Sequence, residues 1–79
     1  MNVLTHKELT QDDIDLYFYY RQKGIRTGFF QRYFKKLNNT KTNFEAFIET
    51  NEEYFTLFGE YRYSCVQSFR NNLKKYLEK

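Results

Sequence analysis

The side chains with the clearest potential for chemistry are the single histidine and the single cysteine, His6 and Cys65. A histidine can serve as a general base or metal ligand, and a cysteine thiolate as a nucleophile or soft metal ligand. Either role needs suitable partners nearby, and the sequence places neither a second histidine nor a cysteine beside His6. We therefore interpret His6 as a solvated side chain. Cys65 falls in the apolar stripe of an expected helix, so we predict a buried thiol that packs as a small hydrophobe.

The carboxylates do not suggest an acid–base pair either. Asp12, Asp13 and Asp15 occupy the first turn of an expected helix, where the helix dipole favours negative charge, and Glu52 and Glu53 occupy a similar position. No glycine precedes a Lys-Ser or Lys-Thr pair, so the sequence has no phosphate-binding loop. We therefore expect a protein that is not an enzyme and that uses no metal, cofactor or small-molecule substrate.

The elements that carry these side chains belong to one small domain. The chain has 79 residues, near the lower limit for a self-sufficient core, and contains nine Phe and eight Tyr. Each large ring can bury roughly 150–250 Å², so aromatic packing offers a way to stabilise the domain without disulfides. The sequence shows no signal peptide and no apolar run of about 20 residues, the length that spans a bilayer. We expect a cytoplasmic protein with no membrane partner.

The first half of the sequence predicts two helices. Thr10 and Asp13 have the spacing of a capping box, which starts a helix over residues 11–23 that ends at Gly24. A second helix is expected over residues 27–37, because apolar residues recur there at steps of three and four. Residues 1–9 carry few apolar groups, so we expect an N-terminal arm there and a single helical domain over residues 10–79.

The second half predicts two short helices and one long helix. The short helices meet at a break near Thr50 and Asn51, where Asn51 is expected to act as an N-cap. The last helix is expected over residues 60–77, with its apolar stripe formed by Tyr61, Cys65, Phe69, Leu73 and Tyr76. Together these elements predict an all-α, compact orthogonal bundle of four to five short helices with a longer C-terminal helix.

Residues 47–58 carry a more specific pattern, Phe-Ile-Glu-Thr-Asn-Glu-Glu-Tyr from Phe47 to Tyr54, followed by Phe58. This pattern resembles the YozE family, small bacterial proteins with a sterile-alpha-motif-like (SAM-like) fold. The segment from Leu16 to Tyr20 also resembles the opening of that family. The chain departs from it in lacking the Phe-Pro-Lys element and in having Cys65 near the family's tryptophan position. The resemblance implies a SAM-like bundle of five helices and no enzymatic activity.

Charge is distributed unevenly along the sequence. Residues 21–41 contain seven Lys or Arg and no acid, whereas residues 45–60 contain five acids and no base. Such segregation predicts an electrostatic field with poles. The basic residues that could form a contiguous patch for nucleic acid or an acidic partner are Arg21, Lys23, Arg26, Arg32, Lys35 and Lys36. An ordinary solvated helix face explains the same residues.

The aromatic excess suggests a second candidate surface. The expected first helix is apolar nearly all round, so part of it is either buried centrally or exposed to a partner. The residues that could form such an aromatic interface are Leu16, Tyr19, Tyr20 and Phe29, with Tyr63 as a further member. The alternative is that the small domain wraps around this helix and buries them.

These observations predict a non-enzymatic interaction module that binds a protein through charged and aromatic surfaces. Self-association is one form of this hypothesis, because the basic 21–41 and acidic 45–60 regions could meet between copies. The first alternative is a small nucleic-acid-binding protein that uses the basic 21–36 patch. The second is a phage or mobile-element accessory protein that inhibits a host complex, which the chain length allows.

Overall fold

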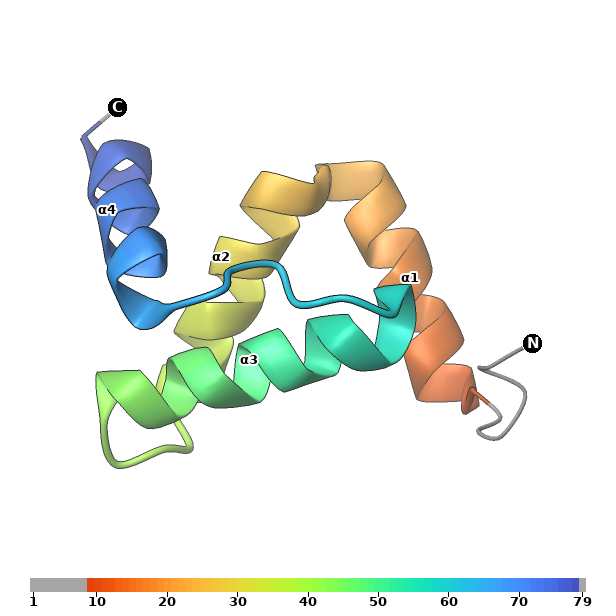
Figure 1. Ribbon diagram of the computed structural model, residues 1–79. Coiled ribbons are helices and arrows are strands. Elements are labelled where there is room, and N and C mark those ends of the chain that lie inside the picture. The colour runs from red at the N-terminus through yellow and green to blue at the C-terminus, as the bar shows by residue number, and fades with distance from the viewer. Residues whose placement is uncertain (1–8, 79) are drawn as a thin grey trace.

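The computed structural model describes residues 9–78, which form four helices and no strand. The helices are α1 (Gln11–Lys23), α2 (Ile25–Leu37), α3 (Asn43–Phe58) and α4 (Val66–Leu77). Figure 1 shows them following one another from the N-terminal to the C-terminal end. The predicted all-α class is confirmed. Of the expected N-terminal arm, residues 1–8 lie outside the described residues, and Leu9 is exposed.

Helix α1 begins and ends as its sequence predicts. The backbone N–H of Asp13 donates to the Thr10 hydroxyl, and the Thr10 N–H donates to the Asp13 carboxylate, both at 3.1 Å. This reciprocal pair is the predicted capping box. Gly24 follows the helix with a φ of 94°, a conformation that suits glycine. Helix α2 begins directly after Gly24, two residues earlier than predicted, so one residue makes the turn between α1 and α2.

Helix α3 runs without the break that we expected near Thr50 and Asn51. The Thr50 hydroxyl donates back to the Ala46 carbonyl of the same helix at 2.7 Å. Asn51 is buried, and its side chain bonds to the backbone of the 60–65 segment rather than to its own helix. The prediction of two short helices here was therefore wrong. The four helices lie within the four to five predicted from the sequence, and residues 9–78 do not form the five helices that the resemblance implies.

The last helix is also shorter than predicted. Residues 60–65 form a non-helical segment, and α4 begins at Val66. Gly59, with a left-handed φ of 79°, ends α3. Asn51 then holds the backbone of Arg62 and Tyr63, which keeps this stretch out of a helix. The expected longer C-terminal helix is wrong, because α3 has 16 residues and α4 has 12.

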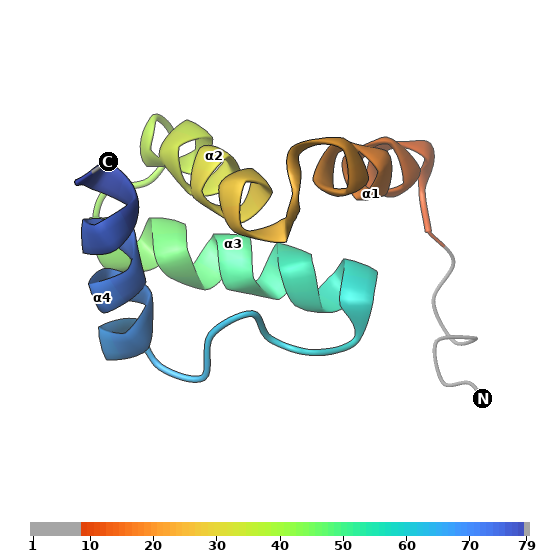
Figure 2. The ribbon, with the colours of Figure 1, turned by 90° about the horizontal axis from the view of Figure 1, so that it is seen from above.

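The helices are arranged around α3. Figure 1 shows α1 and α2 as the two arms of an inverted V, with α3 running across its open side toward α1. The view from above in Figure 2 places α1 and α2 on one side of α3 and the 60–65 segment on the other. Helix α4 stands across one end of α3 in both views. The 60–65 segment thus returns along α3 to place α4 against α2, where Phe69 and Tyr76 of α4 meet the rings of Phe30 and Tyr33.

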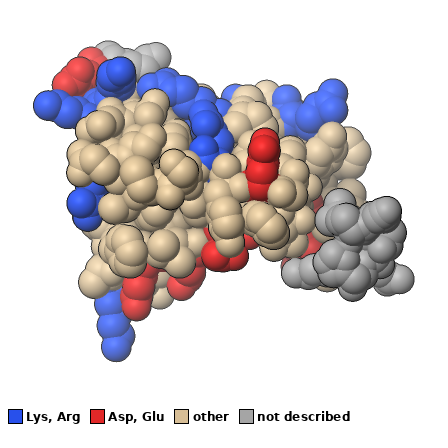
Figure 3. Space-filling view, in the orientation of Figure 1, with Lys and Arg blue, Asp and Glu red and all other residues tan. Residues whose placement is uncertain are grey.

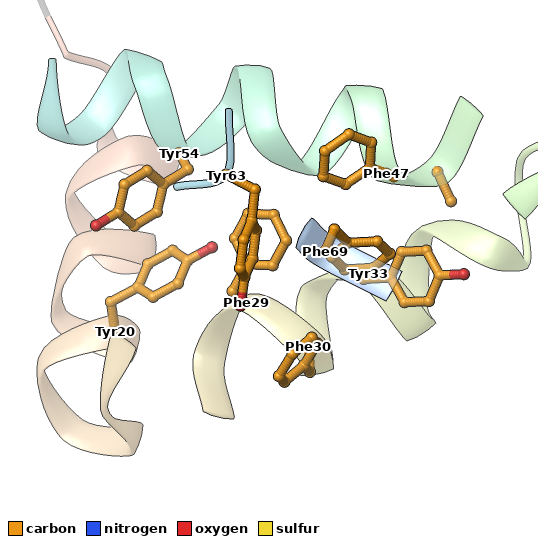
Figure 4. Close-up of a cluster of buried hydrophobic side chains, with 9 residues drawn as sticks. Tyr20, Phe29, Phe30, Tyr33, Phe47, Tyr54, Tyr63 and Phe69 are labelled. Carbon is orange, nitrogen blue, oxygen red and sulfur yellow. The ribbon is translucent and has the colours of Figure 1, made fainter. Parts of the chain in front are cut away.

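The core is almost entirely aromatic. Eight buried rings come from all four helices and the 60–65 segment, together with Ala46: Tyr20, Phe29, Phe30, Tyr33, Phe47, Tyr54, Tyr63 and Phe69. Figure 4 shows these rings gathered between α3 and the other elements. Phe69 is the only fully buried residue that α4 contributes, and its ring centroid lies 4.6 Å from that of Phe47 and 4.8 Å from that of Tyr33. Phe69 therefore anchors α4 to both α2 and α3.

The close approach of α1 to α2 depends on a residue without a side chain. Gly28 in α2 is buried, and a Cβ atom there would lie 2.7 Å from Cδ1 of Tyr20. The Tyr20 ring in turn meets the rings of Tyr54 and Phe58 edge-on, at centroid distances of 5.7 and 5.5 Å. Gly28 thus lets the Tyr20 ring lie between α2 and α3.

Candidate interaction surfaces

The predicted basic patch is divided by the fold. Arg21, Lys23, Arg26 and Lys35 are exposed, whereas Arg32 and Lys36 are only partly exposed. The expectation that Arg32 and Lys36 lie on a solvated outer face of α2 is therefore wrong.

Both of these side chains point to Glu53 on α3. Arg32 donates from Nε to Oε1 of Glu53 at 2.9 Å and from Nη2 to Oε2 at 2.7 Å, a bidentate pair. The Lys36 ammonium lies 3.3 Å from Oε2 of the same carboxylate. Burial alone would raise the pKa of Glu53, but the hydrogen bond and charge of Arg32, with those of Lys36, hold it below its usual value. The cluster ties α2 to α3, so these two cations serve the fold.

The remaining cations lie around the turn between α1 and α2 and on nearby surfaces. The Arg21 guanidinium donates to the Tyr17 hydroxyl at 3.2 Å. The Arg26 guanidinium lies over the rings of Phe30 and Tyr76, at 5.7 and 5.3 Å from their centroids. Figure 3 shows Lys and Arg mainly along the upper edge of the molecule and Asp and Glu mainly along the lower edge, over α3. Figure 3 also shows a cation at the lower left and acids at the upper left and near the centre, so the two charge types are only partly separated on this face.

The aromatic interface that we expected from the sequence is mostly core. Tyr20 and Phe29 are fully buried, and Tyr63 is 6% exposed. Leu16 and Tyr19 are half-buried. The expectation was wrong for Tyr20 and Phe29, as the alternative interpretation of the sequence had allowed. Tyr20 is enclosed by α2 and α3, and Phe29 packs against the rings of Tyr54, Tyr63 and Phe69.

A different set of large apolar residues reaches the solvent, on α3 and the 60–65 segment. We call it the α3 apolar surface, and it consists of Phe44, Ile48, Phe55 and Tyr61. Their exposed fractions are 51%, 40%, 42% and 48%, which is high for such side chains. No described segment of the chain covers them.

Sequence reasoning missed this surface because it divided α3 in two. Phe44, Ile48 and Phe55 recur at steps of four and seven, which places them on one stripe of a continuous helix. The predicted break at Thr50 puts Phe44 and Ile48 on a different helix from Phe55. The predicted helix over residues 60–77 places Tyr61 on the C-terminal helix rather than beside α3. The spacing of Phe44, Ile48 and Phe55 is therefore the sequence feature from which this surface could have been predicted.

Tyr61 is fixed against α3 by two contacts. Its ring centroid lies 4.6 Å from that of Phe55, and its hydroxyl donates to Oε2 of Glu52 at 3.0 Å. The same hydrogen bond to the Glu52 carboxylate raises the pKa of the Tyr61 hydroxyl. Tyr61 therefore presents a positioned ring edge rather than a freely rotating side chain.

A groove of about 360 Å³ runs between α3 and the segment that leads into α4. Phe44, Ile48 and Tyr61 line it, and its deeper wall includes the buried Phe47 and Tyr63. No Lys or Arg is among its described lining residues, and its charged lining residue is Glu52. Beside the apolar stripe, at steps of four and three, α3 carries the exposed row Glu45, Glu49 and Glu52.

A larger hollow of about 890 Å³ lies between α1 and α2. Its α1 wall carries Asp12, Asp13 and Asp15, and its α2 wall carries Arg32 and Lys35. The two walls are of opposite sign, so their charges offset one another across the hollow. A charged ligand in this hollow, whether an anion or a cation, would therefore be repelled by the wall that carries the same charge.

The sequence's two reactive side chains are placed differently from one another. His6 lies outside the described residues. Cys65 is exposed and forms the N-cap position of α4, with no hydrogen bond from its side chain to the described backbone. The prediction of a buried Cys65 was wrong, because α4 begins after this residue and the expected stripe does not reach it. Cys65 instead lines the groove.

Within residues 9–78, no three His, Cys, Asp or Glu side chains gather in a way that could hold a metal ion. None of the helices in that same stretch has the length and apolar character needed to cross a bilayer. Comparisons with known protein families, with curated proteins and with solved structures gave no match.

Proposed function

We propose that this chain is a non-enzymatic, cytoplasmic module that binds another protein through the α3 apolar surface. The observation that carries the proposal is the exposure of Phe44, Ile48, Phe55 and Tyr61 together on one side of the molecule. Aromatic side chains are enriched at protein interfaces, where each can bury a large area on association. Clustered exposed apolar groups are a feature of interaction sites, whereas single ones are ordinary.

The rigidity of the surface supports this function. Tyr61 is held by the Phe55 ring and the Glu52 carboxylate, and the 60–65 backbone is held by Asn51. A partner would therefore order few side chains on binding, which lowers the entropic cost of association.

Affinity capture with matched surface variants tests the proposal. The full chain, its Ile48→Glu and Phe55→Glu variant, and a Phe18→Glu control are each immobilised and exposed to lysate from the native host. Phe18 is 62% exposed on α1, so the control places the same charge on another face. We expect protein partners that the wild type and the Phe18 control retain and that the α3 variant loses, with circular dichroism showing that all three fold. Equal capture by all three chains would contradict the proposal.

A nucleic-acid-binding function is a second candidate, supported by the exposure of Arg21, Lys23 and Arg26 near the turn between α1 and α2, and of Lys35 in the last turn of α2. With Arg32 and Lys36 engaged by Glu53, this patch has fewer free cations than its sequence suggests. It predicts DNA or RNA binding at low salt that weakens steeply as salt is added. Absence of binding of short DNA and RNA duplexes and single strands at low salt would remove this candidate.

The resemblance to the YozE family supports a proposed SAM-like fold and does not bear on what the chain binds. Two residues of the matching pattern, Asn51 and Tyr54, are buried in this structure and act in packing and in holding the 60–65 segment. If this chain shares a SAM-like arrangement with that family, these buried residues account for the similarity in fold. The resemblance adds no partner to the proposal.

A further inference from the structure

The groove beside α3 has a shape that could receive individual side chains of a partner, unlike a flat protein surface. Its exposed walls are Phe44, Ile48 and Tyr61, and its depth is closed by Phe47 and Tyr63 from the core. A volume of about 360 Å³ accommodates two or three large apolar side chains. The occupant must therefore present a small number of apolar anchors close together.

The charges around the groove restrict the occupant further. Glu52 lines it, and Glu45 and Glu49 continue the acidic row along the same helix. Glu53, the fourth acid of this helix, pairs with Arg32 and Lys36 of α2 instead. The acidic row thus has no cation from the groove lining to offset it, and a partner with Lys or Arg beside its anchors gains complementary charge.

The backbone favours a helical occupant. A peptide that binds as an added strand needs a sheet edge, and residues 9–78 contain no strand to extend. An amphipathic helix instead docks through side chains at i, i+4 and i+7, without free backbone groups. From Phe44 to Phe55 the stripe spans eleven residues of helix, about 16 Å at 1.5 Å per residue. That length matches three turns of a docked helix.

We propose that the groove between α3 and the 60–65 segment binds a short amphipathic helix of another protein, with large apolar anchors on one face and Lys or Arg flanking them. The proposal rests on the proposed protein-binding function and specifies the chemistry of its partner. The anchors enter between Ile48 and Tyr61, and the flanking cations lie along Glu45, Glu49 and Glu52.

A second copy of this chain fits the groove less well. The apolar residues that α1 exposes, Ile14 and Phe18, lie on a helix that also carries Asp12 and Asp15. Docking that helix in the groove would bring these carboxylates toward the acidic row of α3, an unfavourable juxtaposition of like charges.

Helix α4 is basic through Arg70, Lys74 and Lys75. However, Leu77 is the one large apolar side chain that it exposes, whereas the groove takes two or three anchors. The partner chemistry is therefore that of a different, basic chain.

A peptide selection tests the proposal without knowledge of the natural partner. A displayed library of random 16-residue segments is selected for binding to the full chain in physiological salt. Enriched peptides are then measured against three proteins: wild type, an Ile48→Ser and Tyr61→Ser variant, and a Phe18→Ser control. We expect enriched sequences with apolar residues at helical spacing and net positive charge, which bind wild type and control and lose roughly tenfold or more in affinity for the groove variant.

Cys65 provides a second test that requires no substitution. It is the only cysteine of the chain, it is exposed, and it lines the groove. Attachment of a bulky maleimide to this thiol should block the enriched peptides as effectively as the double substitution. If the modified chain and the groove variant both bind the peptides unchanged, the groove is not the site and the proposal is wrong.

A charge reversal tests the basic character of the partner. Glu49→Lys changes the acidic row at a residue with no hydrogen bond to another described side chain, and Glu78→Lys makes the same change in net charge at the end of α4. We expect a several-fold loss of peptide affinity for the first variant, reduced by added salt, and none for the second. Enriched peptides that are acidic, or equal effects of both reversals, would overturn the partner chemistry.

The outcomes separate this inference from the function on which it rests. If a captured host protein contacts the α3 apolar surface with a part that is not a basic helix, that result would support the proposed protein-binding function and contradict this inference. An absence of any enriched peptide dependent on Ile48 and Tyr61 contradicts the groove as a helix site. Concentration-dependent dimers in sedimentation that the Ile48→Ser and Tyr61→Ser variant abolishes would identify a second copy as the occupant and overturn the proposal.

Discussion

Arg32 of α2 and Glu53 of α3 form a bidentate ion pair that joins the basic and acidic segments of the chain within one molecule. The sequence separates these charges into two blocks, and a contact between copies is one way to bring such blocks together. The fold brings two of the cations, Arg32 and Lys36, to a single carboxylate instead. The remaining acids of α3, Glu45, Glu49 and Glu52, are exposed to solvent beside the α3 apolar surface.

Replacement of Glu53 by Gln should destabilise the protein by about 1–3 kcal/mol, because it leaves two partly buried cations without their carboxylate. The side chains of Arg32 and Glu53 are only 22% and 20% exposed, so solvent replaces the lost interaction poorly. Urea unfolding at neutral pH measures the difference. Glu49→Gln on the exposed side of the same helix is the matched control, and we expect a change within about 0.5 kcal/mol. Equal effects of the two substitutions would show that the pair does not stabilise the fold.

The same pair predicts an acid-dependent loss of stability. The pKa of Glu53 is held below its ordinary value of 4.5 in the folded protein, so the unfolded chain binds a proton more readily. The stabilisation is therefore fully present above pH 4.5 and is lost as the pH falls through the depressed folded pKa. Unfolding free energies of wild type and Glu53→Gln, measured from pH 7 downward, should converge in this acidic range. A constant difference across it would contradict the shift.

The sequence predicts those parts of this fold that local interactions decide. The capping box at Thr10 and Asp13 and the glycine after Lys23 act within a few residues, and they place α1 where the structure has it. The stripe of Phe30, Tyr33 and Phe34 predicts the buried side of α2 in the same way. Such signals do not depend on how the rest of the chain folds.

The errors lie where a distant contact overrides a local preference. Asn51 has the character of a helix cap, but it lies inside α3 because its amide bonds the backbone of residues 62 and 63. Apolar spacing extends from Tyr61 to Tyr76, but Gly59 and the Asn51 bonds keep residues 60–65 non-helical. The exposed site follows from these two features. It could not be predicted from the sequence without knowing that α3 is continuous.

Asn51→Ala should release the 60–65 segment from α3. The Asn51 amide donates to the Tyr63 carbonyl at 2.9 Å, and its carbonyl oxygen accepts from the N–H groups of Arg62 and Tyr63 at 3.0 and 3.3 Å. Loss of these bonds leaves buried backbone groups unsatisfied, at a cost of about 1–3 kcal/mol. Hydrogen exchange should show the amides of Arg62 and Tyr63 losing protection before those of α2.

A substitution to Asp separates the two halves of the Asn51 contact. Asn51→Asp keeps an acceptor for the Arg62 and Tyr63 amides but turns a carboxylate oxygen toward the Tyr63 carbonyl. We expect a loss of stability that is smaller at low pH, where the protonated carboxyl can donate to that carbonyl. Unchanged protection of Arg62 and Tyr63 in the Ala variant would show that other contacts hold the segment.

Gly28→Ala should destabilise the protein even though alanine favours helix by about 1 kcal/mol relative to glycine. The added Cβ would lie 2.7 Å from Cδ1 and 3.1 Å from Cε1 of Tyr20, whose ring is held by Tyr54 and Phe58. Overpacking of this kind costs about 1–3 kcal/mol and should outweigh the gain in helix propensity.

A double-mutant cycle with Tyr20→Leu tests that cause directly, because the smaller side chain removes the ring that the new methyl group meets. In the Tyr20→Leu background, Gly28→Ala should become neutral or stabilising, so the two substitutions should couple by about 1–2 kcal/mol in unfolding measurements. If Gly28→Ala costs the same in both backgrounds, contact with the Tyr20 ring is not the reason for glycine at this position. The expected coupling would establish that position 28 is glycine because the Tyr20 ring occupies the space that a Cβ atom would need.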